Sequence, residues 1–182
     1  MLKSWPTAGP KIQWRIPLGD GYSGVAISKG KVLTLFSQGN DEFIICLEAK
    51  TGKEIWRVRS DSTYKDVNGN GPRSTPTIHG DVVYALGAHG KLYALQAKNG
   101  KRILNSNLRE AFNGVGPSEG AGYGTSPLIE DEMLALVEAT PNEYKEKASA
   151  EILTGRSITV PALADGKLYL RNMKELVCLE LK

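Results

Sequence analysis

Few residues of this 182-residue chain are of the types that carry out catalysis, and their spacing does not group them. The chain has two cysteines, Cys46 and Cys178, and two histidines, His79 and His89. The cysteines are too far apart in the sequence for a metal-ligating or redox pair. Both histidines fall in turns of one repeat, so neither a metal site nor a serine–histidine–aspartate arrangement is indicated. We expect buried, apolar cysteines and solvated histidines.

Two polar segments contain residues that could bind ions. Residues 61–73, DSTYKDVNGNGPR, have spaced oxygen ligands of the kind that Ca²⁺ prefers, but they lack the distal glutamate of an EF-hand loop. Residues 114–124, GVGPSEGAGYG, are rich in glycine but lack the Gly-Lys-(Ser/Thr) sequence of a phosphate-binding loop. We therefore predict two loops, and long loops on one face of a fold are common places for a partner to bind.

The composition excludes several classes of protein. Lys and Arg number 23 against 20 Asp and Glu, and the basic residues are scattered among turns, unlike the clustered stripe of a nucleic-acid-binding surface. No stretch approaches the ~18 apolar residues of a membrane-spanning helix, and the first residues lack the apolar run of a signal peptide. Twenty glycines and nine prolines favour short strands and tight turns. We expect an all-β chain that neither binds nucleic acid nor spans a membrane.

The elements that position these residues are repeated. The segment ICLEAKTGKEIW at 45–56 returns as YALQAKNGKRIL at 93–104, 48 positions later. That period suits a propeller blade, and each unit has four short apolar runs separated by glycine-containing turns, as in an antiparallel meander. The third unit lacks its second strand, and the fourth lacks its outermost strand. We predict a β-propeller of about four blades, one of them short, in a single domain of residues 1–182. The expected blades are approximately 20–58, 72–105, 122–153 and 156–182.

The outermost strand missing from the fourth unit is present at the other end of the chain. Residues 11–16, KIQWRI, align with the outer strand of the first blade, which places Trp14 where Trp56 stands. We predict that this strand completes the last blade, because the pairing would cover two open sheet edges. A tryptophan at one fixed place in a repeat is expected to pack between neighbouring blades.

The starts of the innermost strands provide the candidate interaction residues. Tyr22, Arg73, Tyr123 and Arg156 recur there, near one rim of the predicted channel. Tyrosine and arginine are enriched in binding hot spots, so these four are candidates for contacting a partner protein. The alternative is that they pack against and hydrogen-bond to neighbouring blades.

With LEAKTGKEIW, residues 47–56, the chain resembles the pyrroloquinoline-quinone-like (quinoprotein-type) β-propeller repeat family. It is similar to uncharacterised bacterial propellers of the outer-membrane-biogenesis and quinone-binding-like kind. Glu48 and Gln96 stand where the repeat usually has Asp. Such proteins are roughly twice this long, with about seven or eight blades. The chain looks shortened, and self-association is expected if four blades do not close a ring.

The resemblance implies two alternative functions. One is a non-catalytic scaffold for protein–protein interaction in the cell envelope, such as outer-membrane protein assembly, and this places the chain in the periplasm or otherwise outside the cytoplasm. The other is a quinone-dependent dehydrogenase, or a shortened remnant of one, which would hold pyrroloquinoline quinone with Ca²⁺, use an aspartate base and often carry two adjacent cysteines. Because the chain has no adjacent cysteine pair, we expect the scaffold, with no cofactor and no catalytic, cofactor-binding or metal residues.

Overall fold

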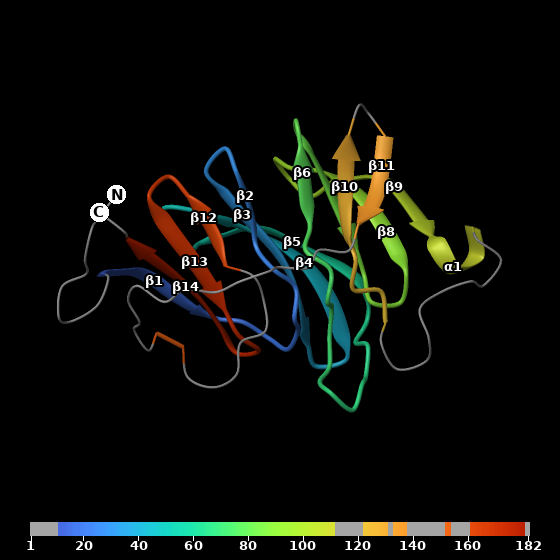
Figure 1. Ribbon diagram of the computed structural model, residues 1–182, viewed down its shortest axis with the longest axis horizontal. Helices are drawn as coiled ribbons and strands as arrows, with labels where there is room; N and C mark the ends of the chain where they lie inside the picture. Colours follow the sequence, from blue (N-terminus) through green and yellow to red (C-terminus); the bar gives the residue numbers. More distant parts are fainter. Residues whose placement is uncertain (1–10, 112–121, 131–132, 138–151, 154–160, 181–182) are drawn as a thin grey trace.

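The computed structural model describes residues 11–111, 122–130, 133–137, 152–153 and 161–180. Within these ranges the regular structure consists of short strands and one helical turn, α1 (Leu108–Ala111). The strands form four sheets, numbered I to IV in the order in which they stand side by side (Figure 1). The predicted all-β propeller fold is confirmed. No helix in the described part is long and apolar enough to cross a membrane.

Three of the four sheets have four strands. Sheet I has the order β1 (Lys11–Pro17), β14 (Glu175–Glu180), β13 (Lys167–Arg171) and β12 (Ala162–Ala164). Sheet II runs β2 (Ala26–Ser28), β3 (Lys31–Gln38), β4 (Asp41–Glu48) and β5 (Glu54–Ser62). Sheet III runs β6 (Thr77–His79), β7 (Val82–Leu86), β8 (Lys91–Gln96) and β9 (Arg102–Asn107). Sheet IV pairs β10 (Ser126–Glu130) with β11 (Met133–Val137).

The first strand of the chain completes the last sheet, as the sequence predicts. β1 pairs antiparallel with β14, from Lys11 opposite Glu180 to Pro17 opposite Glu175. The pairing covers the outer edge of β14, which would otherwise expose a row of unpaired backbone groups. In the third unit, as the sequence predicts, β10 leads directly into β11, with two residues between them. The rest of that unit, residues 138–151, lies outside the described residues.

The outer strands of sheets I, II and III have the same irregularity in their pairing. In each, the register shifts by one residue just before the position that carries tryptophan in two of the sheets. The residue after the shift stands opposite a small residue of the neighbouring strand: Trp14 opposite Cys178, Trp56 opposite Cys46, and Leu104 opposite Ala94. The three sheets are therefore copies of one unit down to the bulge.

Trp14 and Trp56 each lie against a turn of the next sheet. The indole Nε1 of Trp14, in sheet I, donates a hydrogen bond of 3.0 Å to the carbonyl oxygen of Ala49 in sheet II. The indole of Trp56, in sheet II, makes the same 3.0 Å bond to Ala97 in sheet III. Both rings are 8% exposed. The indole N–H therefore binds a backbone carbonyl while the ring buries apolar surface between neighbouring sheets.

The turns that receive the indoles require glycine for two reasons. Gly52 and Gly100 have φ of +71° and +70°, in the region that side chains with a Cβ rarely adopt. A Cβ on either residue would also lie 2.8 Å from the tryptophan ring packed over it. Glycine at this place in the repeat therefore serves both the turn and the contact between sheets.

The hydrophobic core lies between the sheets. One cluster joins sheets I and II around Trp14, Tyr169 and Leu47, and a second joins sheets II and III around Trp56, Leu33 and Leu95. The sheets in Figure 1 are thus held face to face, each by an apolar layer shared with the next.

Candidate functional site

Two of the predicted rim residues, Tyr22 and Arg73, contact each other. The guanidinium carbon of Arg73 lies 5.6 Å from the centre of the Tyr22 ring and 4.8 Å from the centre of the Tyr64 ring. Tyr22 Oη donates to the backbone oxygen of Asn68 at 2.5 Å. The Arg73 side chain is only 14% exposed. The arginine therefore faces the loop of residues 64–73 and is mostly withdrawn from the surface.

The same arginine forms an ion pair with an aspartate of that loop. The loop contains Asp66, Asn68 and Asn70 at the spacing of the first oxygen ligands of a Ca²⁺ loop. Arg73 donates to the backbone oxygens of Gly71 and Gly69 at 2.6 and 3.1 Å and pairs with Asp66 Oδ2 at 3.5 Å. A guanidinium of the chain itself thus neutralises the buried aspartate.

The other two rim residues are placed differently. The Tyr123 amide donates to the carbonyl oxygen of Ala88 at 2.9 Å, and its ring packs over Gly90. Arg156 lies outside the described residues. The turn between Ala88 and Gly90 contains His89, whose ring meets Tyr64 edge-on at 5.1 Å and whose Nε2 is buried. The expectation of a solvated histidine is wrong for His89, because this aromatic contact covers it.

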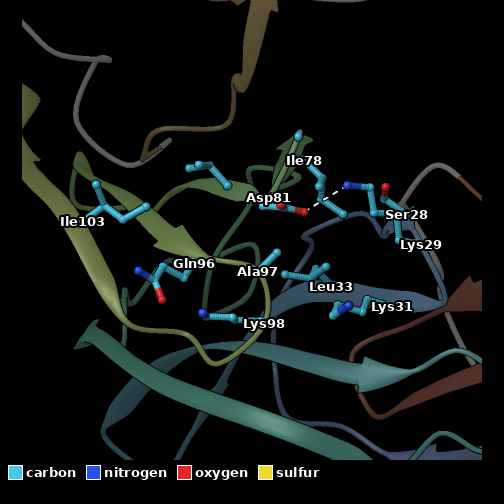
Figure 2. Close-up of a pocket in the computed structure, with 12 residues that line it drawn as sticks. Ser28, Lys29, Lys31, Leu33, Ile78, Asp81, Gln96, Ala97, Lys98 and Ile103 are labelled. Carbon is cyan, nitrogen blue, oxygen red and sulfur yellow. Dashed lines mark hydrogen bonds and ion pairs between the residues drawn. The ribbon is translucent and has the colours of Figure 1, made fainter.

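A pocket of about 410 Å³ lies between sheets II and III, at the end where three turns meet (Figure 2). Its floor is apolar: Leu33, Ile78, Val82 and Ile103. Its rim is polar and mainly basic: Lys29, Lys31, Asp81, Gln96 and Lys98. Lys29 Nζ of sheet II donates a hydrogen bond of 2.9 Å to Asp81 Oδ1 of sheet III. We call the boundary between two neighbouring sheets a seam. Volumes of ~300–1,000 Å³ are typical of ligand sites, so the pocket is large enough to hold one.

The repeat shows why there is room at this seam. Leu33 stands opposite Ala26 in sheet II, and the equivalent position of sheet I, opposite Ala162, carries Tyr169. Tyr169 is buried at the seam between sheets I and II, with its ring centre 6.0 Å from that of Trp14. Between sheets II and III the smaller Leu33 occupies this position and leaves space for the pocket. No motif of the sequence indicates this pocket, because it arises from a size difference between equivalent residues.

A buried acidic pair lies between the same two sheets, near the other end of β4. Glu42 and Asp61 face each other across β4 and β5, and the Glu42 side chain is fully buried. Asp61 Oδ1 pairs with Lys91 Nζ of sheet III at 3.1 Å. Burial, with repulsion from Asp61 in addition, raises the pKa of Glu42 to about 8. Glu42 therefore carries its proton at neutral pH.

Arg171 is a second buried charge that the sequence pattern does not reveal. Its Nη1 donates to the backbone oxygens of Ser23 and Leu35 at 3.1 and 2.6 Å, and Nη2 donates to that of Gly21 at 3.2 Å. Burial lowers the pKa of its guanidinium to about 10, which leaves it charged at neutral pH. Arg171 of sheet I therefore binds backbone carbonyls of β3 and of the segment that leads into sheet II.

The two cysteines of the chain lie in different sheets and form no pair. Cys46 and Cys178 are free and buried, and burial raises the pKa of the Cys46 thiol to about 11. Among the described residues no three His, Cys, Asp or Glu side chains gather closely enough to hold one ion.

Several solved structures resemble the chain at low sequence identity. A quinohemoprotein alcohol dehydrogenase from Comamonas testosteroni is 15% identical, with a TM-score of 0.46 over 68% of this chain and 18% of that one. BamB from Moraxella catarrhalis is 16% identical, with a TM-score of 0.39 over 88% of this chain and 46% of that one. The chain thus spans less than half the length of either. No curated protein matches it in sequence.

The family itself is shown by a match along nearly the whole sequence. The model of the family described as outer membrane protein assembly factor BamB matches residues 4–182. This match includes both turns that receive a tryptophan and the strand that completes sheet I. The chain belongs to this family of quinoprotein-like β-propellers.

Proposed function

We propose that the chain is a non-catalytic propeller scaffold that binds another protein in the cell envelope. The observation that carries the proposal is the pocket between sheets II and III, together with the exposed apolar residues beside it. Ile103, on the last strand of sheet III, lines the pocket and is 55% exposed, and its neighbour Leu104 is 53% exposed. Adjacent exposed apolar side chains next to a hollow are characteristic of protein-binding surfaces.

The repeat shows what covers the equivalent of Leu104 in the two preceding sheets. Trp14 and Trp56 stand at the place of Leu104 and are buried under a turn of the next sheet. Leu104 is 53% exposed among the described residues, and the segment that follows β11 in sheet IV lies outside them.

Family membership supports the cellular context. The family is described by an outer membrane protein assembly factor, so we place the scaffold outside the cytoplasm, in the assembly of outer-membrane proteins. Packing explains three features that could otherwise suggest a reactive site. They are the buried thiols, the Asp66 carboxylate paired with Arg73, and the protonated Glu42. The pocket between sheets II and III, with the exposed Ile103 in its lining, is the part of the described surface that favours a partner.

A photo-crosslinking residue at position 103 tests this function. Ile103 and, as a matched control, Ile55 are each replaced by benzoylphenylalanine in the full chain, expressed in the envelope of its bacterial host. Ile55 is the repeat equivalent of Ile103, is also exposed, and lines no part of the pocket. We expect a discrete adduct with one other protein from position 103 only. Equal labelling at both positions, no adduct, or an adduct of two copies of the chain would contradict the proposal.

A further inference from the structure

We propose that the pocket between sheets II and III binds a peptide segment in which a carboxylate side chain stands beside an apolar one. This inference rests on the proposed function and names the chemistry of the partner at that site. It depends on three properties of the pocket: the charge of its rim, the apolar character of its floor, and its position beside the last strand of sheet III.

The rim has more positive than negative charge. Lys29, Lys31 and Lys98 surround a single carboxylate, Asp81, and Figure 2 shows Lys29 reaching over to it. The hydrogen bond from Lys29, with the charges of Lys29, Lys31 and Lys98 in addition, lowers the pKa of Asp81. Three ammonium groups thus act on one carboxylate, so the rim has an excess of positive charge that favours an anionic group.

Asp81 shows which anion the rim accepts. It is a carboxylate of the chain itself, largely exposed and held at the mouth of the pocket by a single 2.9 Å bond. An incoming glutamate or aspartate could take its place on Lys29 or join it by binding Lys31 and Lys98. A carboxylate is favoured because the anion that Lys29 already holds at the mouth of the pocket, Asp81, is itself a carboxylate.

The floor and the neighbouring strand favour a peptide over a lipid. Leu33, Ile78 and Ile103 give an apolar surface beneath the lysines, which suits a side chain next to the carboxylate. Ile103 lies on β9, which ends sheet III. An extended peptide can place alternate side chains in the pocket while its backbone runs along this strand. An acyl chain would gain nothing from the strand.

The seam between sheets I and II lacks the room and the low acidity found at the seam between sheets II and III, which we call the second seam. The position of Leu33 carries the bulky Tyr169 there, and the position of the neutral Gln96 carries the acidic Glu48. The equivalence of Gln96 and Glu48 follows from their turns, since each accepts a hydrogen bond of 2.8 Å from the glycine four residues on. The second seam is therefore roomier and less acidic than the first.

Calorimetric titration of the full chain with a defined peptide tests the inference. The probe is acetyl-Gly-Glu-Phe-Glu-Leu-Gly-amide, with one control peptide in which Gln replaces Glu and another in which Gly replaces Phe and Leu. We expect binding of the probe that weakens as salt rises, and at least tenfold weaker binding of either control peptide. Equal binding of the Gln peptide would overturn the inference, since charge would then contribute nothing.

Variants locate the binding. Lys98→Ala and Lys31→Ala are each expected to weaken binding about threefold, and Leu33→Tyr about tenfold or more by filling the floor. Lys50→Ala, the repeat equivalent of Lys98 at the first seam, should leave affinity unchanged. Asp81→Asn should tighten binding about threefold, because a competing carboxylate is removed. Equal effects of Lys98→Ala and Lys50→Ala would overturn the inference even if Leu33→Tyr failed to fold.

Two further results separate this inference from the function on which it rests. Decanoate that binds with the same dependence on Lys98, when the peptide does not bind, would overturn the peptide inference in favour of an acyl carboxylate. Peptide failure together with a specific adduct from position 103 would overturn the pocket assignment and leave the scaffold standing. Failure of both experiments would remove the scaffold proposal as well.

Discussion

Replacing the buried acid Glu42 by glutamine is expected to stabilise the protein above neutral pH. In the folded chain burial raises the pKa of this carboxyl from 4.5 to about 8, so folding favours the protonated form. The stability that depends on this proton is fully present below pH 4.5 and is lost as pH rises through 8. A difference of this size corresponds to about 5 kcal/mol in full, and to about 4 kcal/mol between pH 5 and pH 9. Glu42→Gln removes this loss because its amide does not ionise.

Urea unfolding at pH 5, 7 and 9, followed by tryptophan fluorescence, measures the effect. The wild type should lose about 2–4 kcal/mol more than Glu42→Gln between pH 5 and pH 9, since local adjustment reduces the full value. Glu48→Gln serves as the control, because Glu48 lies on the same strand and is exposed. If the free energy of unfolding fell equally with pH in the wild type and in Glu42→Gln, Glu42 would not be protonated in the folded chain, and the reasoning would fail.

Three other substitutions test the packing between sheets and the loop, each by urea unfolding. Gly100→Ala should cost about 2 kcal/mol more than Gly39→Ala, because both glycines have positive φ but only Gly100 lies under an indole; equal costs would disprove the docking. Arg171→Met should cost about 3–5 kcal/mol by leaving buried carbonyls without donors; a loss under about 1 kcal/mol would contradict this fastening role. Arg73→Ala should cost about 2–4 kcal/mol by stranding the buried carboxylate of Asp66; unchanged stability would refute internal neutralisation.

The fold could be predicted from the sequence because its main features repeat. The alternation of apolar runs and glycine turns identifies the strands, and the second tryptophan-containing strand at the start of the chain indicates what pairs with β14. Both inferences use local patterns that every copy of the unit must satisfy. The turns between copies are equally regular, since each needs glycine for its backbone conformation and for the indole that packs on it.

The candidate site could be predicted only in part, because its properties depend on differences between the copies. Tyr22 and Arg73 do contact each other. The arginine, however, points inward and pairs with Asp66, a contact that the sequence does not indicate. Glu42 sits in an alternating strand where an acid would be expected to face solvent, yet the next sheet covers it. The pocket depends on Leu33 being smaller than Tyr169, a comparison that has meaning only after the register of both sheets is known.

The central claim, that the chain is a scaffold and not a quinone-dependent dehydrogenase, is tested most directly by adding pyrroloquinoline quinone with Ca²⁺ to the purified chain. The measurements are the melting temperature and the reduction of an electron-accepting dye with alcohol substrates. A ligand that binds only the folded state must raise the melting temperature. The account predicts an unchanged melting temperature and no dye reduction. A raised melting temperature with substrate-dependent dye reduction would contradict it.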